Sequence, residues 1–262
     1  MRRLIVACLV GGLLGAKVAA GAGAGPGPGA GPARTDPLKV LVPVPLRQAA
    51  RAVAADLQRQ SGLAVDADTE APAALVRRAA GAEAIDVVVL PPSALGPLAG
   101  RGRIDAESVR PVARVEVGVA VRAGARLPAL GTVEAFRKAV LAARRVAYLD
   151  PASGDPVAVH LDGVFEQLQV GDAVRAKAVR VDGGRAADRL ATGEADLALQ
   201  PVSELVGVPG VAYAGPLPEA LQFRLAYAGA VASASTRQED AARFLDALRD
   251  PALRRTHGLL PP

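Results

Sequence analysis

The sequence predicts an α/β fold made of two lobes that are joined by two long strands. From Pro37 onward, short apolar runs alternate with segments whose apolar residues recur every three or four positions, which is the pattern of strands followed by helices. Two longer strand-like runs, 112–124 and 222–232, are long enough to pass from one lobe to the other. No internal repeat is visible, so the sequence does not predict a solenoid.

The first part of the chain has three strand–helix pairs. The predicted strands are 40–44, 63–67 and 85–90, and the predicted helical segments are 46–60, about 72–80 and 93–99. In the first helix, Leu46, Ala49, Val53 and Leu57 recur at helical spacing, and Gly62 is expected to end it. Such alternation implies right-handed βαβ crossovers and a mostly parallel sheet with helices on both faces.

The second part repeats this organisation after the long strand 112–124. The predicted helices are 132–143, 156–169 and 185–192, and the predicted strands are 145–150, 177–181, 195–200 and 211–215. After the second long strand, helices at 236–249 and about 251–257 are expected to return to the first unit. The predicted domains are therefore 37–112 with 222–262 as the first lobe and 113–221 as the second.

Residues 1–20 have the pattern of a secretory signal peptide, with a short cationic start, an apolar stretch from Leu4 to about Leu14, and small residues near Ala20. The stretch Ile5 to Cys8 also fits a lipobox, but only seven residues precede Cys8 and the apolar region continues past it. We therefore expect cleavage without a lipid anchor. Residues 21–36 are rich in Gly, Ala and Pro and predict a linker.

Composition excludes several classes of function. The formal charge of +5 includes three cations of the predicted signal peptide; without them, the 31 Lys and Arg become 28 against 26 Asp and Glu, which is no argument for nucleic-acid binding. Cys8 is the only cysteine, so the cleaved chain would have no disulfide, thiol nucleophile or cysteine metal site. No zinc spacing, GxSxG elbow or EF-hand loop occurs. No cofactor, metal or catalytic residue is predicted.

In a two-lobed α/β protein, the carboxyl ends of the strands of both sheets face one another across a cleft, and the first turns of the following helices favour an anion there. Several polar or small residues follow predicted strands, and each is also explained as a turn or a helix cap. The candidate ligand-binding residues are Val44, Pro45, Thr69, Glu70, Ser93, Ser153, Gly154, Asp155, Arg185 and Gln200.

Five stretches, in this order and spacing, resemble type 2 periplasmic solute-binding proteins, in particular the molybdate-binding-like branch of ABC transporter receptors. The stretches are 40–50, 85–105, 144–170, 183–205 and 241–262. The resemblance implies a two-lobed clamshell, each lobe a mostly parallel sheet flanked by helices, with two hinge strands. It also implies a periplasmic monomer that binds a small solute, with the membrane permease of an ABC transporter as its partner.

The sequence departs from the molybdate-binding pattern at the ligand positions. Pro45 stands where the family has a serine, so a hydroxyl and a backbone N–H donor are both missing. The second strand–helix junction has Thr69 as its only hydroxyl and adds the negative charge of Glu70. Gln200 or Pro201 replaces a late tyrosine. The predicted ligand is therefore a small anionic or polar solute, either a molybdate-like oxyanion or a small organic acid.

Two other functions remain open at this point. One is a sensor or accessory module of the same fold that has lost its oxyanion site and serves no transporter. The other is a secreted hydrolase with Ser153 as nucleophile and Asp155 or His160 as base, although nothing in the sequence fixes their geometry. The predicted signal peptide occupies the place where a LysR-type regulator of similar fold has its DNA-binding domain, which argues against such a regulator.

Overall fold

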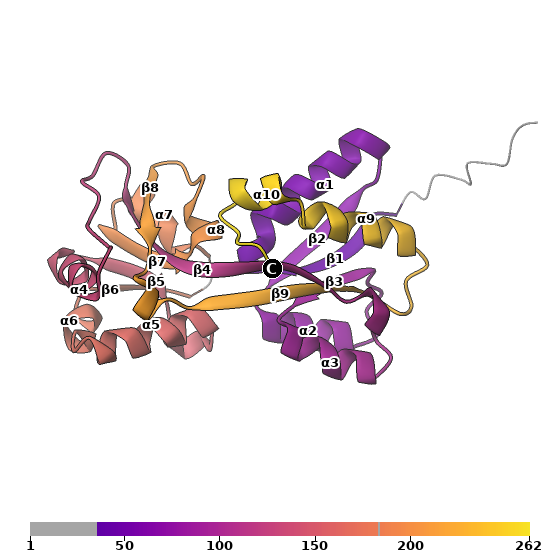
Figure 1. The fold of residues 1–262 in the computed structure, drawn as a ribbon, viewed down its shortest axis with the longest axis horizontal. Helices are drawn as coiled ribbons and strands as arrows, with labels where there is room; N and C mark the ends of the chain where they lie inside the picture. The colour runs from indigo at the N-terminus through magenta and orange to yellow at the C-terminus, as the bar shows by residue number, and fades with distance from the viewer. Residues whose placement is uncertain (1–35, 183) are drawn as a thin grey trace, which may run out of the picture. The chain divides into compact units, whose positions relative to one another are not determined.

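The computed structural model describes residues 36–182 and 184–262, which belong to one compact unit (Figure 1). The predicted signal peptide and all of the predicted linker except Asp36 lie outside the described residues. Within the described residues, no helix has both the length and the apolar character needed to cross a membrane.

The first lobe is a sheet with helices on both faces. Its strands are β1 (Leu38–Pro43), β2 (Val65–Glu70), β3 (Val87–Leu90) and β9 (Arg224–Val231), and its helices are α1 (Arg47–Ser61), α2 (Pro72–Ala80), α3 (Pro92–Gly100), α9 (Gln238–Leu248) and α10 (Pro251–Thr256). Strand β1 pairs in parallel with β2 and β3, and β9 is antiparallel to β3. Gly62 ends α1 in the left-handed conformation, with φ of 70°.

The alternation of side chains along β1 separates two hydrophobic cores. Val40 and Val42 pack with α1 and α9 on one face of the sheet, whereas Leu41 packs with α2 and α3 on the other. Figure 1 shows α1 and α9 on the side of the sheet opposite to α2 and α3. Phe244, Leu245 and Leu248 of α9 belong to the same core as Val40 and Val42, so α9 packs against the first lobe.

The second lobe repeats this layered arrangement. Its strands are β5 (Val146–Leu149), β6 (Ala178–Val181), β7 (Leu197–Pro201) and β8 (Val211–Pro216), and its helices are α4 (Val133–Ala142), α5 (Pro156–Gln167), α6 (Gly171–Arg175), α7 (Ala186–Ala191) and α8 (Val202–Leu205). Strand β5 is parallel to β6 and β7. One core face includes Phe136, Tyr148 and Phe165, and the other is built mainly from small residues around Leu190.

Strand β4 (Arg110–Arg122) belongs to both lobes. It pairs with β9 from Arg110 to Glu116 and with β7 from Val117 to Val121. The nine strands of the described residues therefore form one sheet of order β2-β1-β3-β9-β4-β7-β5-β6, with β8 pairing to β4. The predicted α/β clamshell with a strand that crosses between lobes is confirmed, and Figure 1 shows β4 and β9 lying side by side.

The structure differs from the sequence prediction in a few elements. Strand β2 continues to Glu70, three residues further than predicted, because its whole length pairs with β1. Strand β9 begins at Arg224, since the preceding Leu217 and Leu221 pack in the core of the second lobe. Two short helices, α6 and α8, were not predicted from the sequence.

Candidate functional site

A cavity of about 490 Å³ is lined by residues of both lobes. The first lobe contributes residues that follow β1 and β2 together with two residues of β9. The second lobe contributes the last residues of β5 and β6 and residues that follow them. The lining residues are Val44, Pro45, Ala71, Pro72, Ala73, Leu225 and Tyr227 of the first lobe, and Leu149, Ser153, Gly154, Asp155, Pro156, Val157, Val181, Asp182 and Gly184 of the second. This is the interlobe position expected for a ligand at the carboxyl ends of the strands.

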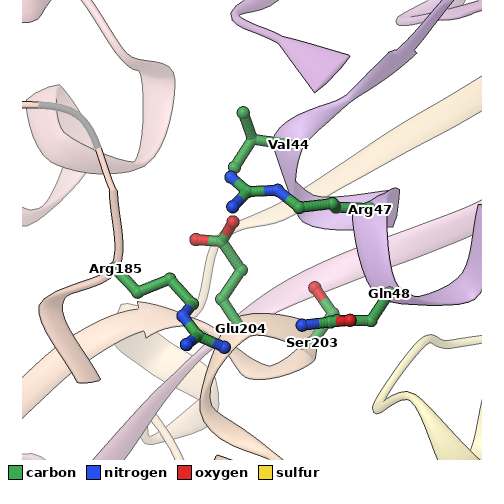
Figure 2. Close-up of a pocket in the computed structure, with 6 residues that line it drawn as sticks. All are labelled: Val44, Arg47, Gln48, Arg185, Ser203 and Glu204. Atoms are coloured by element: carbon green, nitrogen blue, oxygen red, sulfur yellow. The ribbon is translucent and has the colours of Figure 1, made fainter. Parts of the chain in front are cut away.

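A second, much smaller cavity of about 10 Å³ shares Val44 with the first. Its other lining residues are Arg47, Gln48, Arg185, Ser203 and Glu204. Figure 2 shows the side chains of Arg47 and Glu204 pointing toward one another, with Arg185 approaching from the segment before α7. The small cavity therefore brings two arginines and one carboxyl group together beside Val44, which also lines the larger cavity.

The chain between β1 and α1 is a 3-10 turn, Val44–Leu46. Pro45 lies within this turn, where its fixed φ suits the start of a helix and its missing N–H costs little. No side chain caps this turn or the start of α1. The first polar side chain after β1 that lines a cavity is that of Arg47.

The loop between β5 and α5 holds three of the predicted site residues. Gly154 has a φ of 71°, which allows the chain to reverse, and Asp155 then caps α5 by accepting from the N–H groups of Val157 at 2.9 Å and Ala158 at 3.2 Å. The Ser153 hydroxyl donates to the carbonyl of Asp150 at 2.6 Å. Ser153, Gly154 and Asp155 all line the larger cavity.

Gln200 is fully buried at the end of β7 and connects two helices. Its side-chain oxygen accepts from the N–H of Ala187, in the first turn of α7, at 3.3 Å, and its nitrogen donates to the carboxyl of Glu204. Gln200 lines neither cavity itself. Glu204, four residues further on α8, does line the small cavity, and the hydrogen bond from Gln200 holds its carboxyl group in place.

Glu204 is only 4% exposed, and its Oε1 atom has no hydrogen-bond partner. Burial raises the pKa of this carboxyl group to about 7, against the opposing influence of Arg47, Gln200 and Arg185 and with a further rise caused by Asp155. Near neutral pH, Glu204 is therefore present in both protonation states. A carboxyl group of this kind can give or take a proton at the site.

Tyr227 lines the larger cavity and lies close to the carboxyl groups of Asp155 and Glu204. Burial raises the pKa of its hydroxyl far above the ordinary value, and the nearby carboxylates of Asp155 and Glu204 raise it further. The phenol is therefore neutral at physiological pH and is available as a hydrogen-bond donor.

Arg185 immediately precedes α7 and pairs with Asp188 at 2.9 Å. Its side chain remains half-buried and lines the small cavity. Among the predicted site residues, Val44 and Pro45 of the first lobe thus lie near Ser153, Gly154, Asp155 and Arg185 of the second.

Besides Gln200, three other predicted site residues line neither cavity. Thr69 lies in β2, paired with Val42, and Glu70 accepts from Arg78 Nη1 at 2.6 Å. Ser93 is exposed in the first turn of α3 and does not cap that helix. The residues after β2 that do line the larger cavity are Ala71, Pro72 and Ala73.

The geometry does not assemble the hydrolase that the sequence left open. His160 Nε2 donates to the carbonyl of Leu221 at 2.8 Å, and its ring stacks on Phe223 with a centroid distance of 5.0 Å. The Ser153 hydroxyl is bonded to a backbone carbonyl rather than to His160. Within the part of the chain that the structure describes, no group of three or more His, Cys, Asp or Glu could hold a metal ion.

Sequence reasoning did not identify Arg47, Ser203, Glu204 or Tyr227 as site residues. Arg47 directly follows the strand–helix junction 40–46, so its place in the first turn of the helix was an available signal. The other residues gave no comparable signal, because α8 has only four residues and Tyr227 lies within a long strand.

Comparison with known proteins identifies the family. Residues 38–257 match the family described as bacterial extracellular solute-binding protein. The chain belongs to this family. This solute-binding protein is also 32% identical over 204 residues to an aconitate isomerase from Pseudomonas sp, a match that covers 76% of each chain.

Among solved structures, the solute-binding protein resembles the substrate-binding domain of a putative molybdenum ABC transporter from Clostridium difficile, with a TM-score of 0.67, 14% identity, and coverage of 86% of this chain and 98% of the other. It also resembles the periplasmic molybdate-binding protein of Azotobacter vinelandii, with a TM-score of 0.64, 18% identity, and coverage of 86% and 99%. These likenesses show the shared fold, and the resemblance to the molybdate-binding-like branch is confirmed at that level.

Proposed function

We propose that this protein is an exported receptor that binds a small organic acid in the interlobe cavity and presents its closed form to the permease of an ABC transporter. The periplasm is the proposed location, after removal of residues 1–20. The family supports the role of a solute-binding protein, and the structural relative from a molybdenum transporter supports a permease as partner.

The size and the lining of the larger cavity are the reasons for proposing an organic acid as the ligand. Its volume of about 490 Å³ lies within the ~300–1,000 Å³ of small-molecule sites and far above the ~10–15 Å³ that is needed to hold one water. Most of its lining is apolar, including Leu149, Val157 and Leu225. A tetrahedral oxyanion would fill little of this space, whereas a carbon skeleton can bury itself against these side chains.

The polar groups around the cavity favour a carboxylic acid, whose charges are spread over separate carboxylate groups, over a compact dianionic oxyanion. Asp155 and Asp182 line the cavity, and Pro45 offers no backbone donor. The two nearby cations, Arg47 and Arg185, come from opposite lobes, so a carboxylate placed between them would favour closure. The hinge for this closure would be at β4 and at the chain that enters β9.

Thermal unfolding of the purified protein tests this proposal. A ligand at one hundred times its dissociation constant stabilises by about 2.7 kcal/mol, which raises the melting temperature by a few degrees. We expect an increase with di- and tricarboxylates such as succinate and citrate and none with molybdate, tungstate, sulfate or phosphate. An increase with molybdate alone would overturn the choice of ligand. No increase with any solute would favour the non-transport sensor or accessory module.

A second candidate function is isomerisation of an unsaturated carboxylate. Its support is the 32% identical aconitate isomerase together with the buried carboxyl of Glu204, whose pKa of about 7 suits proton transfer. Glu204 would take a proton from a carbon beside the double bond, the double bond would shift by one position, and the proton would return to the far carbon. No co-reactant is needed for this 1,3-shift.

Proton NMR in D₂O separates the two candidates. If the protein is an isomerase, trans-aconitate will convert to the cis isomer, deuterium will enter the carbon positions, and Glu204→Gln will abolish both changes. If trans-aconitate raises the melting temperature but neither converts nor exchanges its carbon-bound protons, the protein is a receptor and the isomerase candidate fails.

A further inference from the structure

Three buried side-chain atoms that lack a hydrogen-bond partner converge on the small cavity. They are Arg47 Nε, Ser203 Oγ and Glu204 Oε1, each within the described residues. Ser203 and Glu204 are only 3% and 4% exposed. Since buried polar groups are nearly always paired in native proteins, three unpaired atoms around one cavity indicate an occupant that would pair with them.

The volume of the small cavity limits what that occupant can be. About 10 Å³ corresponds to roughly one water-sized probe, so the cavity has room for a single oxygen atom. An oxygen atom here would meet the N–H donor of Arg47 and the hydroxyl of Ser203, together with the carboxyl group of Glu204. Val44 lines both cavities, so the small cavity lies beside the space in which we propose that the acid binds.

We propose that Arg47, Ser203 and Glu204 form a subsite for one carboxylate oxygen of the solute, and that Glu204 takes up a proton when this oxygen binds. The inference rests on the proposed organic-acid receptor and adds a proton to its binding reaction. A carboxylate oxygen accepts hydrogen bonds only, so it needs a donor on every side. Protonated Glu204 supplies the third donor, whereas ionised Glu204 would repel the solute.

The groups that face Glu204 come from several elements, and together they allow both protonation states. Arg47 from α1 and Arg185 from the start of α7 favour the carboxylate, as does the hydrogen bond from Gln200 at the end of β7. Burial and the carboxylate of Asp155, at the start of α5, favour the protonated form, and Tyr227 of β9 adds no charge because its phenol is neutral. Since the pKa is about 7 in the empty site, an entering anion would raise it further.

The subsite also connects the lobes. Arg47 belongs to the first lobe, whereas Ser203 and Glu204 belong to the second. An oxygen atom held by all three residues therefore bridges the lobes, so the proton and the solute together stabilise the closed form.

Isothermal titration calorimetry of the purified protein tests the proposal directly. The probe is whichever of succinate, citrate and tricarballylate gives the largest increase in melting temperature, and the titration is done at pH 8 in two buffers of different ionisation enthalpy. All three acids are fully ionised at this pH, so a buffer-dependent heat reports protons taken up by the protein. We expect uptake approaching one proton, and an affinity that falls up to tenfold for each pH unit above about 7.

Two variants locate the proton. Glu204→Gln keeps a neutral side chain at this position, so binding should persist with no proton uptake and no loss of affinity between pH 7 and 9. The matched control is Glu194→Gln, which removes an exposed carboxylate of the same lobe that pairs with Arg189, and it should keep both the uptake and the pH dependence.

The outcomes separate this inference from the proposed function. If none of the three acids binds, the proposed function and the inference both fail. If an acid binds to the wild-type protein with no proton uptake, or if uptake persists in Glu204→Gln, the inference alone is overturned. Because proton uptake is measured on the wild-type protein, the test does not depend on the folding of a variant.

Discussion

The side-chain amide of Gln222 makes two hydrogen bonds to the backbone of Val117. Its oxygen accepts from the Val117 N–H at 2.9 Å, and its nitrogen donates to the Val117 carbonyl at 3.0 Å. Val117 is the residue at which β4 stops pairing with β9 and begins to pair with β7. Gln222 therefore continues the ladder of the sheet by one step at the point where the chain passes between the lobes.

Replacing Gln222 by Ala should destabilise the protein at this crossing. The change removes these two hydrogen bonds, the one that the Gln222 oxygen accepts from the Phe223 N–H at 2.9 Å and a longer one to the Leu217 carbonyl at 3.5 Å, and it is expected to lower the free energy of unfolding by about 1–3 kcal/mol. Urea-induced unfolding measures the change. Gln238→Ala is the control, because Gln238 is exposed and donates only to the carbonyl of Ser235, and its effect should stay within about 0.5 kcal/mol. Equal midpoints for the wild type and Gln222→Ala would contradict the prediction.

Asp155 caps α5 and also lines the larger cavity. Comparing it with Asp250, which caps α10 and lines neither cavity, separates the two roles. Asp155→Ala removes the cap of α5 and should cost about 1 kcal/mol, as should Asp250→Ala, which removes the cap of α10. Asp250 lies outside both cavities, so only Asp155→Ala should change the affinity for the solute. Unfolding curves and calorimetric titration of both variants provide the comparison, and equal affinities would place Asp155 outside the binding site.

Gly118 leaves room for α8, the helix that carries Glu204. A Cβ atom at this position would lie 2.8 Å from Val202 of α8 and 2.8 Å from the ring of Tyr213. Gly118→Ala should therefore displace α8 and lower stability by about 1–3 kcal/mol. Gly96→Ala is the control, since nothing lies within 4 Å of the added atom and alanine favours the helix; it should be neutral or stabilising by up to ~1 kcal/mol. Thermal or urea unfolding that ranks the two variants the other way would refute this account.

The raised pKa of Glu204 gives stability a definite pH dependence. The folded protein holds the proton up to a pH of about 7, whereas the unfolded chain releases it near the ordinary glutamate pKa of 4.5. The contribution of this group is therefore fully present below pH 4.5 and is lost as the pH rises through 7, with a magnitude on the order of 3 kcal/mol. Glu204→Gln should remove this decline. Unfolding free energies measured between pH 4 and 8 check it, and parallel curves for the two proteins would count against it.

The fold was predictable because it depends on patterns that many residues share. The apolar spacing of α1, the Gly62 terminator and the long run of β4 each express a regular element, and regular elements leave a periodic signal. The positions of Ser153, Asp155 and Arg185 beside the cavities could be predicted for a related reason. Each follows a predicted strand, and in this topology ligands bind beyond the ends of the strands.

The charged part of the site was not predictable in the same way. Helix α8 spans four residues, fewer than are needed to show helical periodicity, and an isolated glutamate after a strand is normally exposed. The burial of Glu204 arises from tertiary contacts of α8 with β4, β7, β8 and the turn Val44–Leu46. Thr69 and Glu70 were placed at a strand end that the structure extends, because β2 pairs with β1 along its full length.

The insertion of the second lobe between β4 and β9 affects the order in which the chain can fold. The core of the second lobe uses residues 117–221, which form one continuous segment, whereas the core of the first lobe joins Val40 and Ala50 near one end of the chain to Phe244 and Leu245 near the other. Contacts so far apart in sequence form slowly. During synthesis, the second lobe can complete its core as soon as it emerges, while the first must wait for α9. An incomplete chain therefore exposes the apolar faces of β1 and α1 until α9 packs against them.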